Sequence, residues 1–488
     1  MSARGIARAG LALIGAVVLA CAGGGPRAAG GARPVGELPA LGGTPLRPER
    51  LVLVSLHGLE PEHYLAVSGE PLMPNAAALG AAGVAAESMQ PVFPAASYPA
   101  HATLVTGLPP ARHGVAADHR LDEHGVEPER PDQASALAGV TLWKAVAAAG
   151  GSVASLDWPA TGGAPIADLL PDLDATRRGA SWTALMAPGT APRVAALAQR
   201  AGAAQPASWP PGPAHDAVLV AVACDLLAAA PPPQLLLLRL TQTEAALAAA
   251  PPGSESVRQA FAAADVEIGR LVGCLRAHDR LATTGIVVVG DHGTLPVHTA
   301  IRANRVLADV GLLVLDANGA LLRWDALARS NGGSAFVYAK GPELAVLARQ
   351  ALEESARESG AFRVMSADEM LRDGADPEAW FGLAAAPGYA FDDGLRESVL
   401  GPAAFASAGG YAPDELRMAA GFVAWGPGLR GPLRIPALRQ LDVAPTLARW
   451  LGVSLEGAEG RALVGLLRGA GAPVVAPIDT PKRRPLGS

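Results

Sequence analysis

The sequence LVLVSLHG, residues 51–58, decides the fold of this chain. Its first six residues form an apolar run broken only by Ser55, a pattern typical of a strand buried on both faces in a parallel sheet. His57 and Gly58 follow at once, so the strand brings an imidazole to the loop at its carboxyl end. Ligands of open α/β sheets bind at that end of the strands. The stretch therefore predicts a buried strand with a candidate functional histidine at its tip.

Four further stretches have a buried-strand pattern. They are VASL at 153–156, QLLLLRL at 234–240, IVVV at 286–289 and GFVAW at 421–425. Asp291 and His292 follow the third of them and should reach the same sheet edge as His57. After Ser254, apolar residues at spacings of three and four predict a long helix that packs on the sheet. Strands alternating with helices predict an α/β fold, with a mostly parallel central sheet and helices on both faces.

A second informative segment is SYPAHATLVTG, residues 97–107. Pro99 in the first turn and Gly107 just past the end predict a short helix. Ser97 at its start has two interpretations. It is an ordinary N-cap, or its hydroxyl lies where free backbone N–H groups and the helix dipole favour a phosphate. The residues alone leave both interpretations open.

Composition limits the function classes. The chain has 488 residues, enough for one large α/β domain with an insertion. Half of the residues are hydrophobic and the net charge is −6, which argues against a polybasic surface for a nucleic-acid polymer or a membrane. Cys224 and Cys274 lie in apolar helical stretches, and we interpret them as buried small hydrophobes rather than a redox pair.

The N-terminus has the pattern of an export signal. Arg4 and Arg8 precede an apolar run over residues 11–20 that ends at Cys21. Residues 1–21 are therefore predicted to be a lipoprotein-type signal peptide, with Cys21 as the lipidated residue; an ordinary signal peptide with an incidental cysteine is the alternative. Lipidation would anchor the protein to a membrane of the bacterial cell envelope, in a periplasmic or extracytoplasmic location. Residues 22–49 are predicted to be a flexible tether, and residues 470–488 a disordered tail.

The segment 97–107, followed by PARHG at 110–114, resembles the nucleophile segment of the type I phosphodiesterase/nucleotide pyrophosphatase family, within the alkaline phosphatase superfamily. The resemblance extends over about residues 50–468, with the segments in the same order. It implies an alkaline phosphatase-like core at 50–299 and 401–469, with a small inserted cap region at 300–400. It also implies a phosphate-ester hydrolase site with two metal ions around a Thr or Ser nucleophile, here Ser97.

The resemblance implies a usable ligand set for one of the two metal ions and an incomplete set for the other. One ion would be held by His57, Asp291 and His292 together with Ser97, although the family has an Asp where His57 stands. Imidazole is a good zinc ligand, so one zinc ion remains possible there. The ligand positions of the second ion align with Glu244, Ala248 and Gly409. No histidine occurs between His215 and His278 or after His298, so Glu244 is a weak remnant and the second metal site is predicted to be absent.

Three functions remain open at this stage. Ala100 stands where relatives place a polar phosphate contact, which removes a further group that stabilises the transition state. With half of the metal ligands gone as well, the sequence favours a pseudoenzyme that binds a phosphate-containing ligand or an unknown protein partner. The alternatives are an active single-metal phosphomono- or phosphodiesterase with Ser97 as nucleophile, and a structural envelope protein.

Overall fold

The computed structural model describes residues 35–66, 69–122, 124–126, 130–172, 189–202, 212–395, 398–412 and 415–469. The predicted signal peptide with Cys21, residues 22–34 of the predicted tether and the predicted tail at 470–488 lie outside these ranges. Within the described residues, no helix combines the length and the apolar character that crossing a membrane would require.

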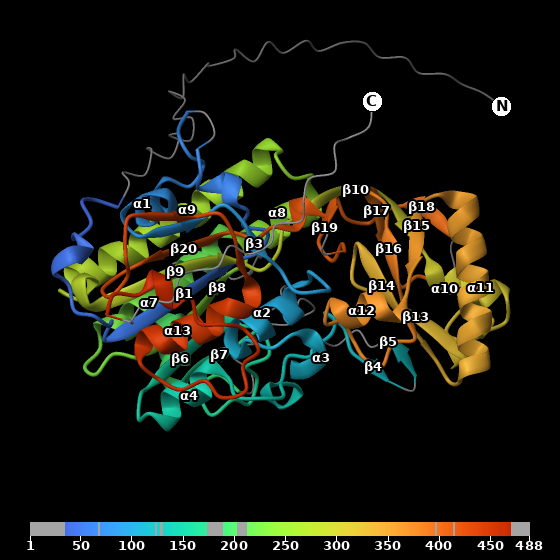
Figure 1. The fold of residues 1–488 in the computed structure, drawn as a ribbon, viewed down its shortest axis with the longest axis horizontal. Helices are drawn as coiled ribbons and strands as arrows, with labels where there is room; N and C mark the ends of the chain where they lie inside the picture. The colour runs from blue at the N-terminus through green and yellow to red at the C-terminus, as the bar shows by residue number, and fades with distance from the viewer. Residues whose placement is uncertain are drawn as a thin grey trace, which may run out of the picture. The chain divides into compact units, whose positions relative to one another are not determined.

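An eight-stranded sheet is the centre of the fold (Figure 1). In spatial order its strands are β21 (Leu433–Ile435), β2 (Val84–Ala86), β20 (Phe422–Trp425), β9 (Thr284–Gly290), β1 (Arg50–Leu56), β8 (Leu235–Leu240), β6 (Val153–Trp158) and β7 (Asp168–Pro171). From β9 to β7 every neighbouring pair is parallel, whereas β20 runs antiparallel to both β9 and β2. The predicted strands and the mostly parallel α/β sheet are confirmed.

Two groups of helices cover this sheet. The first consists of α1 (Pro74–Ala82), α6 (Pro192–Gly202), α7 (Pro213–Ala228), α8 (Gln242–Ala249) and α9 (Glu255–Ala277), and the second of α2 (Ser97–Thr106), α4 (Leu142–Ala148) and α13 (Val443–Leu451). Figure 1 shows α1 and α9 on one side of the sheet and α4 and α13 on the other. The apolar stripe predicted after Ser254 is the buried face of α9. Gly107 and Gly452 end α2 and α13 in the left-handed conformation, which glycine adopts without steric cost.

A second, smaller core accounts for the region predicted as an insertion. Its main sheet has the order β13 (Ala326–Ser330), β14 (Ser334–Ala339), β16 (Phe381–Ala385) and β15 (Phe362–Met365). Around it lie α10 (Ala303–Asp309), α11 (Pro342–Ser359), α12 (Ala367–Arg372), and the pair β11 (Leu313–Leu315) and β12 (Leu321–Trp324). Apart from Phe93, the buried hydrophobic residues of this core come from residues 301–391.

Short strands join the two parts of the chain. After β9, the strand β10 (Leu295–Ile301) pairs with β17 (Gly388–Phe391), β18 (Leu400–Pro402) and β19 (Ser407–Ala408). Further elements of the described residues include the strand pairs β3 (Met89–Gln90) with β22 (Leu438–Arg439) and β4 (Leu121–Asp122) with β5 (Gly125–Val126), and the one-turn helix α3 (Pro110–His113). The chain therefore leaves the large sheet through β10 and returns to it at β20.

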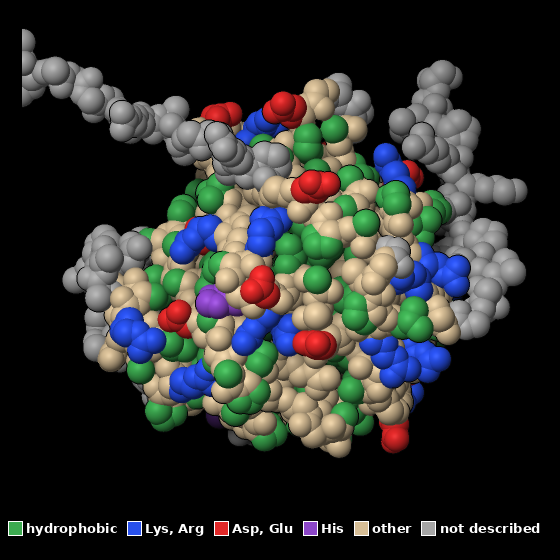
Figure 2. All heavy atoms as spheres, turned by 90° about the vertical axis from the view of Figure 1, so that its left-hand side faces the viewer, with side chains coloured by type: hydrophobic (Ala, Val, Ile, Leu, Met, Phe, Trp, Pro, Cys, Tyr) green, Lys and Arg blue, Asp and Glu red, His purple; other side chains and the backbone are tan. Residues whose placement is uncertain are grey.

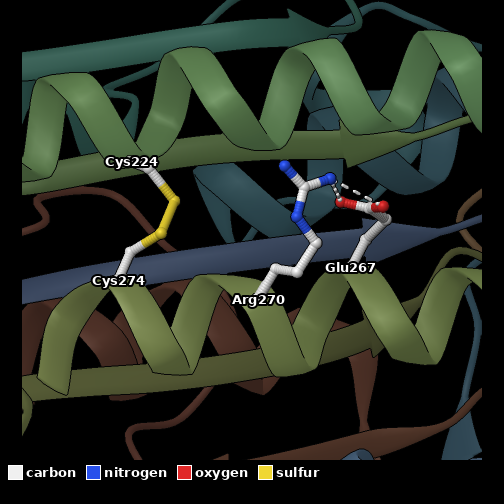
Figure 3. Close-up of a disulfide and its surroundings, with 4 residues drawn as sticks. All are labelled: Cys224, Glu267, Arg270 and Cys274. Carbon is white, nitrogen blue, oxygen red and sulfur yellow. Dashed lines mark hydrogen bonds and ion pairs between the residues drawn. A yellow bond between two sulfur atoms is a disulfide. The ribbon is translucent and has the colours of Figure 1, made fainter. Parts of the chain in front are cut away.

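The interpretation of Cys224 and Cys274 as separate buried hydrophobes is wrong. The two residues form a disulfide between α7 and α9, with their Cα atoms 5.6 Å apart (Figure 3). On α9, Arg270 forms a salt bridge to Glu267 three residues earlier, with an N–O distance of 2.7 Å. The disulfide joins two helices that already pack together on the sheet.

The surface has mixed charge on the face that Figure 2 presents. Lys and Arg side chains alternate there with Asp and Glu, and hydrophobic side chains lie between them. This distribution fits the small net charge of the chain, −6. It offers no extended basic area on that face for a polyanion.

Candidate functional site

His57, Asp291 and His292 meet at the carboxyl ends of two adjacent strands. Leu56 at the end of β1 pairs in register with Gly290 at the end of β9, so the residues that follow are neighbours. The His57 Nδ1 atom lies 2.9 Å from the Asp291 Oδ2 atom, and the His292 Nε2 atom lies 3.6 Å from it. One ligand atom from each of the three side chains lies within 4.8 Å of the other two. Residues distant in sequence thus form one group suited to a metal ion.

Hydrogen bonds fix the orientation of this group. The Asp291 carboxylate accepts from the backbone N–H of Gly58 at 3.0 Å and of His292 at 2.9 Å. The His292 Nδ1 atom lies 2.8 Å from the Gly293 carbonyl and donates to it, which leaves the lone pair on Nε2. Thr243 donates to the His57 carbonyl at 2.8 Å. Such outer contacts set the tautomer and direction of metal-ligating side chains, so the group fits a divalent cation such as zinc.

The charges within the group favour an ionised carboxylate. Burial alone would raise the pKa of Asp291, but the imidazoles of His292 and His57 hold it well below its ordinary value. Burial lowers the pKa of His292. A metal ion binds carboxylate and neutral imidazole, so Asp291 and His292 are in the forms that ligation requires. Burial opposes protonation of His57, but Asp291 raises its pKa, so a bound cation would have to displace that proton.

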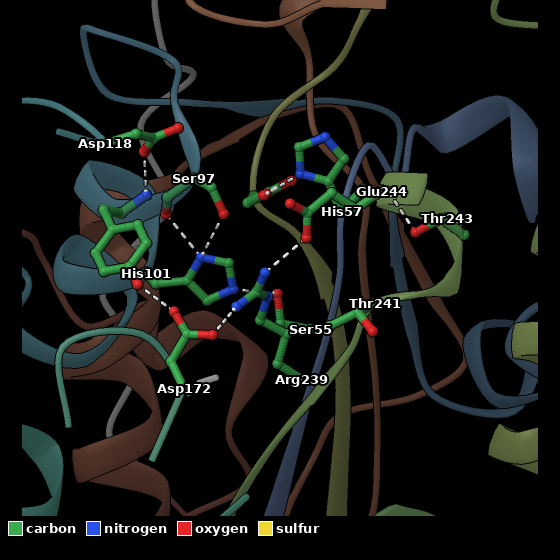
Figure 4. Close-up of polar contacts among 12 residues, drawn as sticks. Ser55, His57, Ser97, His101, Asp118, Asp172, Arg239, Thr241, Thr243 and Glu244 are labelled. Atoms are coloured by element: carbon green, nitrogen blue, oxygen red, sulfur yellow. Dashed lines mark hydrogen bonds and ion pairs between the residues drawn. The ribbon is translucent and has the colours of Figure 1, made fainter. Parts of the chain in front are cut away.

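Ser97 is the first residue of α2, and the N-cap position belongs to Ala96. The N-cap interpretation of Ser97 is therefore wrong, since its side chain makes no capping bond. Its backbone neighbour Tyr98 donates its N–H to the Asp118 carboxylate at 2.8 Å, so one amide of the first turn already has an anionic partner (Figure 4). Ser97 is 5% exposed, and its Oγ atom lies 3.4 Å from the Nδ1 atom of His101.

His101 cannot act as the base for Ser97. Its Nδ1 atom lies 2.7 Å from the Ser97 carbonyl oxygen, an obligate acceptor, so Nδ1 carries the proton. Its Nε2 atom, 2.8 Å from the Ser55 hydroxyl, accepts from that side (Figure 4). Burial also lowers the pKa of His101 to about 4. Among the described residues, the hydrogen-bond partner of the Ser97 hydroxyl is thus the protonated Nδ1 atom of His101, which cannot accept the hydroxyl proton.

The positions aligned with the second metal ion do not provide a ligand set. Ala248 offers no ligand atom on α8. A Cβ atom at Gly409 would lie 2.5 Å from the His292 ring and 2.7 Å from the Ala95 carbonyl, so this position borders the metal group but has no room for a side chain. Ala100, the lost polar contact, is fully buried in α2. His298 is exposed, and its Nδ1 atom lies 2.7 Å from the Thr299 hydroxyl.

Glu244, the remaining carboxylate of that set, is bound by arginine. Arg239 in β8 donates to the Glu244 Oε2 atom at 2.7 Å and to the Asp172 Oδ1 atom at 2.7 Å (Figure 4). Sequence reasoning missed the roles of Arg239 and Asp172. The signal was the single arginine in the run QLLLLRL, because a charged side chain in a buried strand requires a charged partner.

His113, the last residue of α3, makes folding stability depend on pH. Val115 N–H donates to its Nδ1 atom at 3.1 Å, and its Nε2 atom lies 3.1 Å from the Thr103 hydroxyl. Burial lowers the pKa of His113 to about 3, below that of an unfolded histidine, about 6.5. Unfolding therefore takes up a proton below pH 6.5. Between pH 7 and pH 5, we expect this group alone to reduce the unfolding free energy by about 2 kcal/mol.

Urea unfolding at the two pH values measures this effect. The His113→Asn variant should lose about 2 kcal/mol less than the wild type over that interval, because asparagine does not titrate. Equal losses in both proteins would show that His113 is not held neutral in the folded state.

Comparisons with known proteins identify relatives of this chain. Residues 51–374, more than half of the chain, match the sequence profile of the family described as Type I phosphodiesterase / nucleotide pyrophosphatase. A curated protein of Bos taurus, ectonucleotide pyrophosphatase/phosphodiesterase family member 3, is 27% identical over 114 residues, 22% of this chain. Those residues span 13% of the bovine protein.

Solved structures share the fold. Human ectonucleotide pyrophosphatase/phosphodiesterase 5 superposes with a TM-score of 0.63 at 17% identity, covering 86% of this chain and 100% of its own. The murine protein of the same name gives a TM-score of 0.61 at 18% identity, with coverages of 86% and 100%. An inactive form of that murine protein in complex with AMP superposes with a TM-score of 0.60 at 18% identity, covering 86% of this chain and 99% of its own. At these identities the likeness establishes the α/β fold.

Proposed function

This chain belongs to the type I phosphodiesterase/nucleotide pyrophosphatase family, and from that premise we propose that it binds one zinc ion and a phosphate-containing ligand with lost or strongly reduced hydrolysis. The observation that carries the proposal is the contrast between two sets of positions. His57, Asp291 and His292 converge as a metal group, whereas Glu244, the one possible ligand of the second set, is bound by Arg239.

The single cation has a defined environment. His57, Asp291 and His292 would hold it, with the Asp291 carboxylate supplying the negative charge. A divalent cation there would neutralise phosphate charge and favour ionisation of a bound hydroxyl. Ser97 lies at the start of a ten-residue helix, whose positive dipole end attracts an anion. These features support retention of phosphate binding.

Reduced catalysis follows from the missing groups. A two-metal site stabilises both the attacking and the leaving oxygen, and the degenerate second set, Glu244, Ala248 and Gly409, supplies no cation for one of them. Ala100 has no polar atom with which to contact the phosphate in the transition state. The hydrogen-bond partner of Ser97 is the protonated nitrogen of His101, so the hydroxyl has no base in that residue.

An active single-metal phosphomono- or phosphodiesterase is the second candidate. The convergence of His57, Asp291 and His292 supports it, because a cation held there would also favour ionisation of the Ser97 hydroxyl, which phosphate binding alone does not require. In this alternative Ser97 would attack phosphorus directly. The two proposals differ in whether removing the Ser97 hydroxyl changes the hydrolysis rate.

Metal analysis combined with a hydrolysis assay tests the proposal. We expect about one zinc ion per chain, and equal slow hydrolysis of a nitrophenyl phosphate monoester and diester by the wild type and by Ser97→Ala. Ser256→Ala, at the exposed start of α9, is the control variant. A wild-type rate more than about 100-fold above that of Ser97→Ala would instead establish the single-metal enzyme. Two zinc ions per chain, or none, would contradict the proposal.

We further propose that the protein is a lipoprotein of the cell envelope, anchored through Cys21. The Cys224–Cys274 disulfide supports an extracytoplasmic location, because disulfides persist mainly in oxidising compartments. Mass spectrometry of the mature N-terminal peptide should find a lipidated Cys21, and Cys21→Ala should leave the membrane fraction. An intact N-terminus in the mature protein would contradict this proposal.

A further inference from the structure

Four charged side chains form a cluster beside Ser97, which we call the arginine cluster: Arg130, Asp172, Arg239 and Glu244. Arg239 lies between the two carboxylates, with both contacts at 2.7 Å, and is 1% exposed. Arg130 approaches the other oxygen of Glu244 at 3.8 Å. Figure 4 shows Arg239 between Asp172 and Glu244, next to the His101 ring.

The net charge of the arginine cluster equals that of a divalent metal ion bound by two carboxylates. Two guanidinium groups, always protonated in proteins, balance two carboxylates. One divalent cation held by two carboxylates has the same net charge, zero. Glu244 is the position that aligns with the carboxylate ligand of the second metal ion. The two arginine residues of the cluster therefore place beside this carboxylate the positive charge that a second cation would supply.

The arginine cluster is connected to the nucleophile position. Tyr98, directly after Ser97, donates its hydroxyl to Asp172 in a short hydrogen bond. The Arg130 guanidinium lies 5.6 Å from the centre of the Tyr98 ring. His101, which contacts both Ser97 and Ser55, lies next to the Arg239 guanidinium (Figure 4). Among the described residues, the buried Nε–H of Arg239 has no hydrogen-bond partner.

We infer that the arginine cluster replaces the second metal ion with fixed positive charge, so that a phosphate group binds beside Ser97 while the chain holds a single zinc ion. This inference rests on the proposed function and specifies how its ligand is held. The ligand class is a phosphate monoester, a diester or inorganic phosphate. The partly exposed Arg130 offers N–H donors that match phosphate oxygens, whereas the terminal nitrogens of Arg239 already contact Asp172 and Glu244 and contribute charge.

Replacing a metal ion with guanidinium groups affects phosphate binding and phosphate-ester hydrolysis differently. A guanidinium attracts a phosphate and donates hydrogen bonds to it. It has no empty orbital with which to coordinate an oxygen, so it cannot stabilise an alkoxide leaving group as a metal ion does. A site with one metal ion and the arginine cluster thus retains affinity for phosphate and loses the coordination of the leaving oxygen that a second metal ion would supply.

Calorimetric titration of inorganic phosphate into the zinc-loaded full chain tests the inference. The variant Arg239→Met/Glu244→Gln removes one charge of each sign, so it keeps the net charge. We expect its phosphate affinity to fall at least about tenfold, with the zinc content still one ion per chain. Arg329→Met/Asp376→Asn is the matched control, because it also keeps the net charge and Arg329 is another buried arginine, which contacts Asp376 and Tyr338 in the second core. Its phosphate affinity should be that of the wild type.

A second measurement uses the wild type alone, in case the double variant does not fold. Phosphate affinity should be the same with one and with several equivalents of zinc added. Unchanged affinity in the double variant would overturn the inference and leave the proposed function standing, whereas affinity that rises with a second equivalent of zinc would indicate a second bound zinc ion and contradict the proposed function as well. A wild type that binds neither zinc nor phosphate would overturn both.

Discussion

Asp291→Asn is expected to reduce zinc affinity by more than about 100-fold. Loss of an outer hydrogen-bond partner already costs 10- to 100-fold in metal sites, and Asp291 is itself one of the three candidate ligands. It is fully buried, and it is the anionic member of the group. Asparagine retains a carbonyl oxygen but no negative charge, so the two imidazoles would have to hold the cation alone. Elemental analysis after equilibrium dialysis measures the change.

Asp265→Asn is the control for this experiment. Asp265 is also a buried carboxylate that accepts two backbone N–H bonds, from Asn75 and Ala76. It joins α9 to α1 and belongs to no candidate metal group among the described residues. Its variant should bind zinc like the wild type. If Asp291→Asn also retained full zinc affinity, the cation would have to bind elsewhere in the chain.

Arg239→Met is expected to reduce the unfolding free energy by about 3–5 kcal/mol. Removing one partner of a buried ion pair leaves an uncompensated charge in the interior, and this cost is far larger than the net contribution of the intact pair. Here Asp172 and Glu244 would each lose the Arg239 guanidinium that lies 2.7 Å away, while Arg130 would stay 3.8 Å from Glu244. Urea unfolding followed by circular dichroism gives the free energy.

Two further variants separate charge from packing. Arg349→Met on α11 breaks a half-exposed pair with Glu353 four residues later and a contact with the Phe381 ring, and should cost no more than about 1 kcal/mol. Adding Asp172→Asn and Glu244→Gln to Arg239→Met also removes the charges of the two carboxylates that Arg239 contacts. The triple variant should recover most of the lost stability. If it remained as unstable as Arg239→Met, the loss would come from packing and not from charge.

The core of the fold and the metal group were predictable for the same reason. A buried parallel strand must be apolar along its whole length, so β1, β8 and β9 are visible as runs of Leu, Val and Ile. The carboxyl ends of adjacent parallel strands lie at one edge of the sheet. His57 and Asp291 therefore had to be close once their strands were recognised.

Other features depend on contacts that local sequence does not encode. Asp172 and Arg239 are 67 residues apart, and only the packed fold brings the end of β7 to β8. Cys224 and Cys274 each have the pattern of a core residue, and their bond requires that α7 and α9 are adjacent. Whether Ser97 is the N-cap or the first helical residue depends on a shift of one position in the start of α2. Helix propensities do not locate the start of a helix with that precision.

The disulfide between α7 and α9 encloses a stretch of chain that includes β8 and α8, and with them Arg239 and Glu244. Exposed residues Pro251 and Gly253 lie between α8 and α9, within the enclosed stretch. A protease that cuts the backbone once at that point would produce two polypeptides still joined by sulfur. On a denaturing gel the nicked protein would migrate as a single species until dithiothreitol released its halves.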